Sequence, residues 1–314
     1  HANVLPTKSI ISKIKKLQHG EFLSVKNEGG IAYKFSAKEV LGLHKIKITH
    51  SVEHNESLKV LHYPWQIFQL NDWAIRQDFE LITARRKSKP ISKTNTIINV
   101  AQIFIEAGAK VEHCTLNAST GPIYIGKNAE IQEGTMIRGP FALCEGSLVK
   151  MGSKIYGATT IGPYCLAGGE IKNSILLGYS NKAHDGYLGD SVIGEWCNLG
   201  AGTSNSNLKN NCGDVSYWVH ADKKQISAGN KGGLLLGDYS KSAINTSFNT
   251  GTVVGICSNV FAQGLTPKYI PHFSRGCDDI TRYKLSNALE DINKWKQLKG
   301  FSITEKEKQI LMDI

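Results

Sequence analysis

A histidine stands among glycines and asparagines in the stretch SNKAHDGYLGDSVIGEWCNLGAGTSNSNLKNN, residues 180–211. Histidine titrates near neutral pH, so His184 is a candidate general base that removes a proton from a nucleophile. The turn Gly200-Ala201-Gly202 offers a backbone N–H with no bulky side chain in the way, and such a donor stabilises charge on a carbonyl oxygen. Together these groups suit acyl transfer from a thioester to an amine, which requires neither a metal nor a covalent enzyme intermediate.

The alternative is that His184 is a loop histidine held by its neighbours and performs no chemistry. Taken singly, Tyr187 would be a packing tyrosine, and Asn198 and Asn207 would be corner residues with left-handed backbone. The catalytic interpretation therefore depends on the whole group, which also includes Lys172.

A six-residue apolar period indicates the scaffold that positions this stretch. Six is the period of a parallel β-helix, in which each flat face takes one hexapeptide and one side chain per face points into a narrow prism. The residues in register are Ile125, Ile131, Ile137, Leu143, Val149, Ile155 and Ile161. A second run in register is Leu236, Ser242, Phe248, Val254 and Val260.

Between the two runs the register slips, once over residues 164–190 and again over residues 206–233. We expect both stretches to be loops that leave the prism. Loops on a rigid scaffold often carry binding and catalytic groups.

The flanking regions have a different composition from the prism. Residues 7–17 and 63–82 show helical spacing, and residues 21–35 suggest a hairpin. Residues 280–298 and 304–314 again suggest helices, which we expect to cover the end of the prism. We expect a mainly β chain with an α/β piece at 1–98, the β-helix at 99–276 and a helical cap at 277–314. Residues 1–98 contain no Gly-rich phosphate loop, so we expect an incomplete nucleotide-binding domain.

Composition limits the partners. The chain has 314 residues, 41% hydrophobic and 20% charged, as in an ordinary globular protein. The net charge of +10 suits an anionic ligand, but the lysines are scattered, so we expect a phosphate-bearing small molecule rather than nucleic acid. No apolar run approaches the roughly 18 residues of a membrane span, so we expect no membrane insertion and a cytoplasmic location.

The cysteines predict reduced thiols rather than a disulfide framework or a zinc site, because their number is odd and no CxxC pair occurs. They are Cys114, Cys144, Cys165, Cys197, Cys212, Cys257 and Cys277.

The segments IRGPFA, KIYGATTIGPYC, GYSNKAHDGYLGDSVIGEWCNLGAGTSNSNLKNN and FNTGTVVG resemble the Bacteroidetes-type bifunctional glucosamine-1-phosphate acetyltransferase / N-acetylglucosamine-1-phosphate uridyltransferase family. The resemblance covers nearly the whole chain from Ala2 onward. It implies an N-terminally truncated uridyltransferase domain followed by a left-handed β-helix acetyltransferase domain. It also implies a homotrimer with active sites between adjacent prisms, which uses acetyl-coenzyme A and an amino-sugar phosphate to make UDP-N-acetylglucosamine.

The resemblance also implies roles for six residues, and all six match the family pattern in kind. His184 is similar to the general base, and Asn207 to the residue that holds the reacting amine or the base. Lys172 and Tyr187 match sugar-phosphate contacts, and Asn198 matches a sugar contact. Ala201 corresponds to the backbone N–H that meets the thioester carbonyl, and is the cofactor-binding position.

The chain departs from the family in two places. An arginine that grips the acceptor phosphate is replaced, since the chain reads Leu143, Cys144 and Glu145 after GPFA. Its substitutes would be Arg138, Lys150 or Lys154, each of which is equally well explained as a solvated rim residue. The uridyltransferase signature is also missing, so we expect no nucleotidyl transfer by this chain, and Mg²⁺ only in a complete nucleotidyltransferase domain.

Three functions are compatible with these observations. We prefer the acetyltransferase, with coenzyme A along residues 242–264 and its phosphates near Lys241 or Lys268. The second is a sugar-1-phosphate nucleotidyltransferase in which the β-helix serves only to form the trimer. The third is a non-catalytic β-helix scaffold, which would have no need of the cluster around His184.

Overall fold

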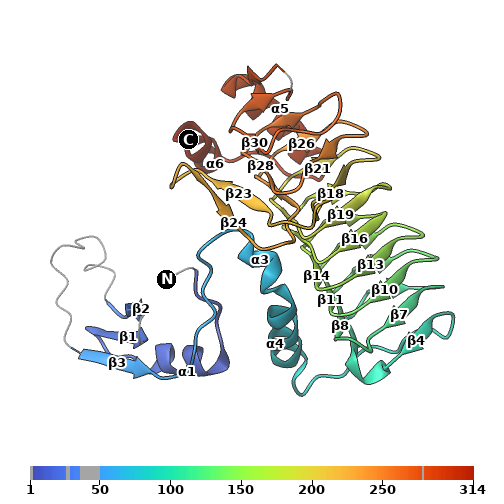
Figure 1. Cartoon of the computed structure of the whole chain (residues 1–314). Helices are drawn as coiled ribbons and strands as arrows, with labels where there is room; N and C mark the ends of the chain where they lie inside the picture. The colour runs from blue at the N-terminus through green and yellow to red at the C-terminus, as the bar shows by residue number, and fades with distance from the viewer. Residues whose placement is uncertain (1–2, 26–28, 36–49, 278) are drawn as a thin grey trace. The chain divides into compact units, whose positions relative to one another are not determined.

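The computed structural model describes residues 3–25, 29–35, 50–277 and 279–314, and the chain forms two compact units, residues 1–66 and 67–314 (Figure 1). The first unit contains helix α1 (Lys8–Lys16) and a sheet in the order β2 (Gly29–Tyr33), β1 (Glu21–Val25), β3 (His50–His54). Strand β1 is antiparallel to β2 and parallel to β3. The predicted helix and hairpin are confirmed, although residues 26–28 of the hairpin lie outside the described residues.

Helix α1 folds because its cap and its apolar side both have partners. The Thr7 hydroxyl accepts a hydrogen bond from the Ile10 amide at 3.2 Å, which satisfies one of the free amides of the first turn. Ile10 and Leu17 are buried against Leu23, Val25 and Ile31 of the sheet. The first unit therefore has a small core of its own.

The second unit is a parallel β-helix, and the mainly β fold class is confirmed. Each coil contributes one strand to each of three flat faces, and equivalent strands of successive coils pair in parallel, as the stacked arrows of Figure 1 show. We call these faces 1, 2 and 3 in chain order, and the turns between them corners 1–2, 2–3 and 3–1.

Face 1 consists of β4 (Thr96–Ile98), β7 (Thr115–Asn117), β10 (Met136–Arg138), β13 (Lys154–Tyr156), β16 (Glu170–Lys172) and β19 (Tyr187–Gly189), continued by β22 (Ser204–Asn205) and β27 (Ser247–Phe248). Face 2 consists of β5 (Ile103–Ile105), β8 (Ile123–Ile125), β11 (Phe141–Leu143), β14 (Thr159–Ile161), β17 (Ile175–Leu176), β20 (Val192–Ile193), β25 (Leu234–Leu236), β28 (Thr252–Val254) and β30 (Tyr269–Ile270). Face 3 consists of β6 (Lys110–Val111), β9 (Glu130–Ile131), β12 (Leu148–Val149), β15 (Leu166–Ala167), β18 (Asn181–Lys182), β21 (Asn198–Leu199), β26 (Lys241–Ser242), β29 (Asn259–Val260) and β31 (Ser274–Arg275). The last strand of this sheet, β32 (Thr281–Arg282), is antiparallel to β31. A short 3₁₀ helix, Val100–Gln102, joins the first strands of faces 1 and 2.

The predicted inward residues fill the prism. All seven of the first run, from Ile125 to Ile161, are at most 2% exposed. In the second run Ser242 is 7% exposed, and its hydroxyl oxygen lies 2.8 Å from that of Thr203. The six-residue period therefore identified the core, because each face of a coil can direct only one side chain into the narrow interior.

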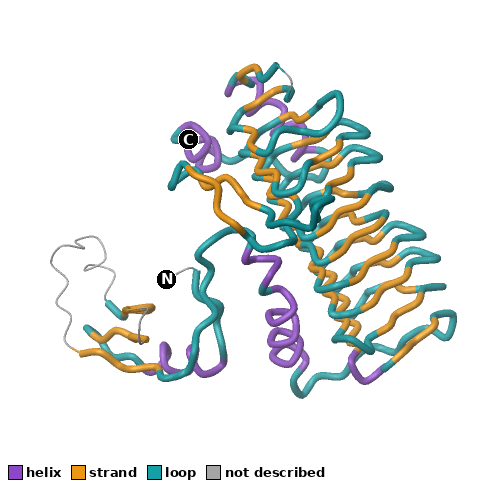
Figure 2. The backbone as a smooth tube through the Cα atoms, in the orientation of Figure 1, coloured by secondary structure: helices purple, strands orange, loops and turns teal. Residues whose placement is uncertain are grey.

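One of the two predicted loops is wrong. Residues 164–190 do not leave the prism but form β15 to β19 in regular parallel pairing. The register slips because this part has short corners, such as Gly168-Gly169, where other 3–1 corners have four residues, as in 150–153. The second loop is confirmed, since residues 206–233 leave the prism and carry the hairpin β23 (Ser216–Val219) and β24 (Lys224–Ser227) (Figure 2).

Helices cover part of the outside of the prism. Residues 63–82 form α3 (Gln66–Gln69) and α4 (Asn71–Thr83). The Asn71 side chain donates to the Ala158 carbonyl at 2.8 Å and accepts from the Thr160 hydroxyl at 3.0 Å, which fixes the start of α4 on face 2.

The C-terminal helices α5 (Leu285–Gln297) and α6 (Glu305–Met312) pack along corner 2–3. Their apolar side chains Ala288, Ile292 and Leu311 meet Cys257 and Phe273 in one cluster. Following α5, the Lys299 ammonium donates to the carbonyls of Tyr164 and Tyr179 at 3.0 and 2.9 Å. The helices therefore cover this corner over several coils, rather than only the end of the prism.

The predicted domain bounds, 1–98, 99–276 and 277–314, stay a prediction, because the compact units describe packing alone. All seven cysteines lie among the described residues, where none of them is joined in a disulfide, and only Cys144 and Cys212 are not buried. None of the helices within the described ranges is long and apolar enough to cross a membrane.

Candidate functional site

Five of the six predicted site residues lie in neighbouring coils of the prism, and the sixth, Asn207, stands where the chain leaves the prism after β22. Lys172 ends β16, Tyr187 begins the adjacent strand β19, and Asn207 follows β22 on the same face 1. Asn198 begins β21 on face 3. His184 and Ala201 stand at corner 3–1, which joins these two faces.

Corner 3–1 places the candidate base below the candidate oxyanion donor. His184 is exposed, and the Gly202 amide donates to the Asp185 carbonyl at 3.0 Å, so the 200–203 turn stacks on the 183–186 turn. The Ala201 carbonyl accepts from the Asn245 amide at 2.7 Å, and the Gly200 amide donates to the Ser242 carbonyl at 3.2 Å. The Gly200 carbonyl, which shares the peptide plane of the Ala201 N–H, accepts from the Thr203 amide at 3.1 Å. The peptide units around the Ala201 N–H are therefore held in place.

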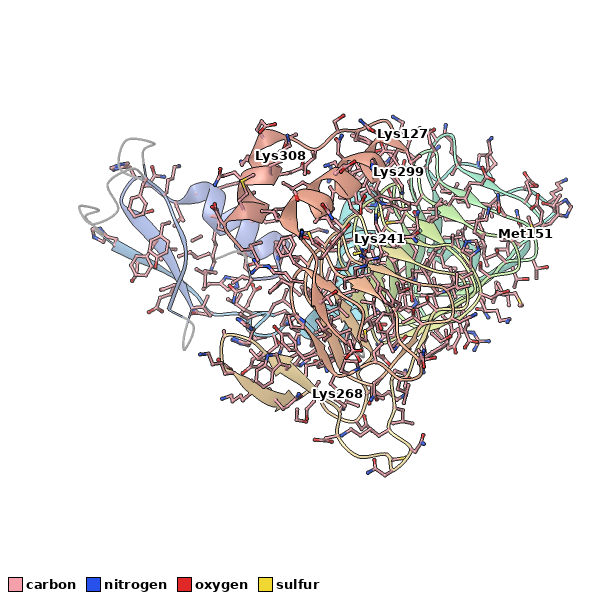
Figure 3. All side chains as sticks on the ribbon, turned by 90° about the horizontal axis from the view of Figure 1, so that it is seen from above. Lys127, Met151, Lys241, Lys268, Lys299 and Lys308 are labelled. Atoms are coloured by element: carbon pink, nitrogen blue, oxygen red, sulfur yellow. The ribbon has the colours of Figure 1, made fainter. Side chains whose placement is uncertain are left out.

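Gly200 is required in this turn because the backbone of the next coil approaches closely. A Cβ atom on Gly200 would lie 2.5 Å from the Ala243 carbonyl carbon. Met151 stands at corner 3–1 of an earlier coil, and Figure 3, a view from above, shows it at the rim. Corner 3–1 is therefore an outer edge of the prism.

A hydrogen-bonded group on face 1 includes two of the predicted residues. The Asn207 side-chain amide donates to the Tyr187 hydroxyl at 3.1 Å and also to Asp190. The other oxygen of Asp190 accepts from Asn173 at 2.6 Å. Because both amide hydrogens of Asn207 are engaged, its carbonyl oxygen is the group that it can offer to a substrate.

Asp190 was missed by the sequence reasoning. It is 3% exposed and has left-handed backbone, with φ of 48°. Asp190 ends the YLGD segment, in which the carboxylate comes directly after the strand that begins with Tyr187 and ends with a glycine. That position, a polar residue at corner 1–2 of the coil that carries the candidate base, is the signal that could have identified it.

A second group lies one coil below on the same face. The Tyr156 hydroxyl donates to Glu170 at 2.6 Å, and the Lys172 ammonium lies 5.8 Å from the centre of the Tyr156 ring. The hydrogen bond to Glu170 and burial raise the pKa of Tyr156 to about 12. Burial, followed by the charge of Asp190, raises the pKa of Tyr187, so both hydroxyls stay protonated donors near neutral pH.

The residues considered in place of the phosphate-binding arginine differ in burial and in location. Leu143 is fully buried in the prism, so it offers nothing to a ligand, while Glu145 is exposed. Arg138 and Lys154 are exposed on β10 and β13 of face 1, the face of Lys172. Lys150 stands at corner 3–1.

The two lysines predicted beside coenzyme A also differ. The Lys241 ammonium lies 5.0 Å from the centre of the Trp295 ring, beneath α5, and burial lowers its pKa. Lys268 precedes β30 on face 2 and lies beside the β23–β24 hairpin in Figure 3. Burial, followed by the nearby Lys209, lowers the pKa of Lys268. Within the described part of the chain, no cluster of three or more His, Cys, Asp or Glu side chains is arranged to hold a metal ion.

Residues 1–87 match the family described as sugar nucleotidyl transferase. The chain is 26% identical over 230 residues to a bifunctional sugar-1-phosphate nucleotidylyltransferase/acetyltransferase of Sulfurisphaera tokodaii, covering 69% of this chain and 47% of that protein. It is 28% identical over 266 residues to the bifunctional protein GlmU of Methanococcus maripaludis, covering 83% of this chain and 57% of that protein. The chain thus spans about half the length of these relatives.

Solved structures that resemble the chain include the polySia-specific acetyltransferase NeuO, with 12% sequence identity and a TM-score of 0.33. The superposition covers 66% of this chain and 100% of that chain. The sequence matches confirm the resemblance to bifunctional sugar nucleotidyltransferase/acetyltransferase proteins that was drawn from the motifs.

Proposed function

We propose that the β-helix of this chain is an N-acetyltransferase that moves acetyl from acetyl-coenzyme A to the amine of glucosamine 1-phosphate. The observation that carries the proposal is the corner at which exposed His184 lies one coil below the Ala201 amide, at the start of the face that carries the group of Tyr187, Asn207 and Asp190. The product would be N-acetylglucosamine 1-phosphate, the precursor of UDP-N-acetylglucosamine. Acetyl-coenzyme A is made in the cytoplasm, so the reaction would take place there.

The chemistry assigned to these groups is a simple addition and elimination. The sugar amine attacks the thioester carbonyl carbon while the His184 imidazole accepts the proton that the nitrogen loses. The Ala201 N–H donates to the oxygen that becomes negative, and collapse of the intermediate breaks the carbon–sulfur bond. The leaving thiolate takes the proton from the imidazolium, which releases coenzyme A as the thiol and restores the base. Asn207 would orient the amine or the imidazole through its carbonyl oxygen.

Substrate binding is assigned to face 1 and its neighbours. Lys172 and Tyr187 would contact the sugar phosphate and Asn198 the sugar, with Arg138 and Lys154 on the same face as candidates for the second phosphate contact. Lys268 suits the phosphates of coenzyme A better than Lys241, because Lys241 already lies against Trp295.

We also propose a homotrimer in which the site lies between adjacent prisms, because the flat faces of a prism bury surface when they pack on copies of themselves. Light scattering should then give a mass three times the 34.4 kDa of the chain, and a stable monomer would contradict this.

The deciding experiment measures thiol release from acetyl-coenzyme A with a panel of amino-sugar 1-phosphates. The rate of thiol release should increase with the concentration of glucosamine 1-phosphate. It should not increase with N-acetylglucosamine 1-phosphate, whose amine is blocked. Unphosphorylated glucosamine shows how much of the recognition comes from the phosphate. If no amino sugar increases thiol release above the background hydrolysis, the acetyltransferase proposal is wrong.

A second candidate, a sugar-1-phosphate nucleotidyltransferase with the β-helix as a trimer-forming scaffold, is favoured by the family match of residues 1–87. It would need Mg²⁺ and would release pyrophosphate from a nucleoside triphosphate. Measuring pyrophosphate under the same conditions separates the two functions. Thiol release without pyrophosphate supports the acetyltransferase, and pyrophosphate without thiol release supports the alternative.

A further inference from the structure

A lysine lies inside the prism in the coil that carries His184. Lys182 ends β18, pairs in register with the inward residue Ala167 of the coil below, and is 1% exposed. Its ammonium donates to the Gly168 carbonyl at 3.1 Å and to the carbonyl of His184 itself. The charged group therefore joins the corner of the candidate base to the corner of the coil below.

The arrangement differs from that of the other buried lysine among the described residues. Lys296 on α5 is 4% exposed and forms an ion pair with the Glu307 carboxylate. The hydrogen bonds of Lys182 go to neutral carbonyls instead, and burial lowers its pKa to about 8, against a smaller opposing effect of Asp185. Burying an ammonium with only carbonyl partners destabilises the folded state, so an apolar side chain at this position would make the fold more stable.

Neighbouring coils satisfy corner 3–1 in a different way. The Lys150 carbonyl accepts from the hydroxyls of Thr135 and Ser153, at 3.0 and 2.6 Å. Higher in the stack the Ala243 carbonyl accepts from the hydroxyls of Thr203 and Thr246, at 3.2 and 2.9 Å. A Ser or Thr at the last position of the corner is thus the usual donor to its carbonyls.

The His184 corner cannot use that solution. Its last position is Gly186, with φ of 120°, and a Cβ atom there would lie 2.1 Å from the Thr203 carbonyl oxygen. No hydroxyl side chain fits, and the corner below, Gly168-Gly169, has no hydroxyl either. The Lys182 ammonium supplies the donors that both corners lack.

From this arrangement we propose that Lys182 is a positioning residue for acetyl transfer, which holds the backbone of His184 so that the exposed imidazole projects from a fixed corner. The inference rests on the proposed acetyltransferase function. Lys182 itself touches neither substrate, because it is enclosed in the prism. It acts by removing the freedom of residues 183–186, since a base that is free to move spends less time in the reactive geometry.

The test replaces Lys182 by Met, which keeps the length of the apolar stem and removes the ammonium. We expect kcat for acetyl transfer to fall about 10- to 100-fold with KM for acetyl-coenzyme A unchanged, because positioning of the base affects the chemical step. Hydrogen exchange of the amides of residues 183–186 should accelerate in Lys182→Met, while that of residues 200–203 changes less. Lys182→Gln keeps a neutral donor, so its kcat should lie between those of the wild type and Lys182→Met. If Lys182→Met does not fold, Lys182→Gln serves for the same test.

Two controls separate positioning from general loss of structure. Lys296→Met removes the other buried ammonium and should lower the melting temperature without changing kcat. In the His184→Ala background, Lys182→Met should cause no further loss of rate, because it acts through the base that is already absent. Wild-type kcat in Lys182→Met, or an equal further loss in the double variant, overturns the inference. Absence of thiol release by the wild-type chain instead overturns the proposed function, and the inference with it.

Discussion

The early coils of the prism, residues 96–167, and the later coils, residues 170–248, solve the same packing problem with different side chains. In the early coils the inward positions hold apolar side chains, such as Ile137 and Ile155, at 2% and 1% exposure. In the later coils they include Lys182 and Asn205, which are 1% and 5% exposed. The candidate site lies where polar residues enter the core.

The later coils tolerate these residues because each one has partners. Asn205 accepts from the Gly189 amide at 2.8 Å and donates to the Gly189 carbonyl at 3.0 Å, so it pairs with the adjacent strand as a backbone unit would. Lys182 donates to two corner carbonyls. The comparison teaches that regular repeats supply stability, whereas departures from the repeat supply positioned polar groups.

The largest effect should come from the corner of the later coils. His184→Ala should lower the acetyl-transfer rate by about 10²–10⁴, the usual contribution of a positioned base, or about 3–5 kcal/mol in the barrier. Stability should change by less than about 0.5 kcal/mol, because the side chain is exposed. The matched control is His113→Ala, another exposed histidine at corner 3–1 but in an early coil, which should keep the wild-type rate. Equal losses in both variants would show that the effect is not specific to the site.

The apolar stack of the early coils should show the opposite behaviour. Ile155→Ala should reduce the free energy of unfolding by about 2–5 kcal/mol, because it removes buried methyl groups and leaves a cavity. Urea denaturation followed by circular dichroism measures the loss. Ile244→Ala at corner 3–1, where the side chain is 69% exposed, should change stability by less than about 0.5 kcal/mol. A small effect at Ile155 would mean that the prism relaxes around the gap.

The enclosed ammonium should give the later coils a pH dependence that the early coils lack. The pKa of Lys182 is about 8 in the fold against 10.5 for an ordinary lysine, so between these values the unfolded chain binds the proton and the folded chain releases it. Stability therefore rises with pH across this window, and comparison with Lys182→Met, which has no such term, should show a relative gain of about 3 kcal/mol. Urea denaturation at pH 7.5 and pH 10.5 measures it. A constant difference between the two proteins would contradict the burial of a charged lysine.

The smallest effect should come from the group on face 1. Asn207→Ala should slow acetyl transfer by about tenfold, because it removes orientation rather than the proton acceptor. Asp190 would keep Asn173 as its partner, so the fold should remain intact. Asn117→Ala, also on face 1 but in an early coil, should leave the rate unchanged. A loss as large as that of His184→Ala would instead give Asn207 a direct part in the proton transfer.

The sequence by itself determined the β-helix and its inward residues. One side chain per six residues must point into a prism whose faces each take one hexapeptide, so the spacing from Ile125 to Ile161 identifies the core without any long-range information. It also placed His184 in a turn, because the glycines and asparagines around it exclude a helix. The helices at 7–17 and in the C-terminal region followed from local capping and periodicity.

Only the tertiary structure decided which polar residues meet. Asn207, Asp190 and Asn173 lie in successive coils, each 17 residues apart, and their contacts depend on how many residues each corner takes. The two-residue corner Gly168-Gly169 shifts every later position, which is why residues 164–190 resemble a loop and why Lys182 was not recognised as an inward residue. Corner length is set by the closure of three faces around a shared core, and that closure depends on residues a whole coil away.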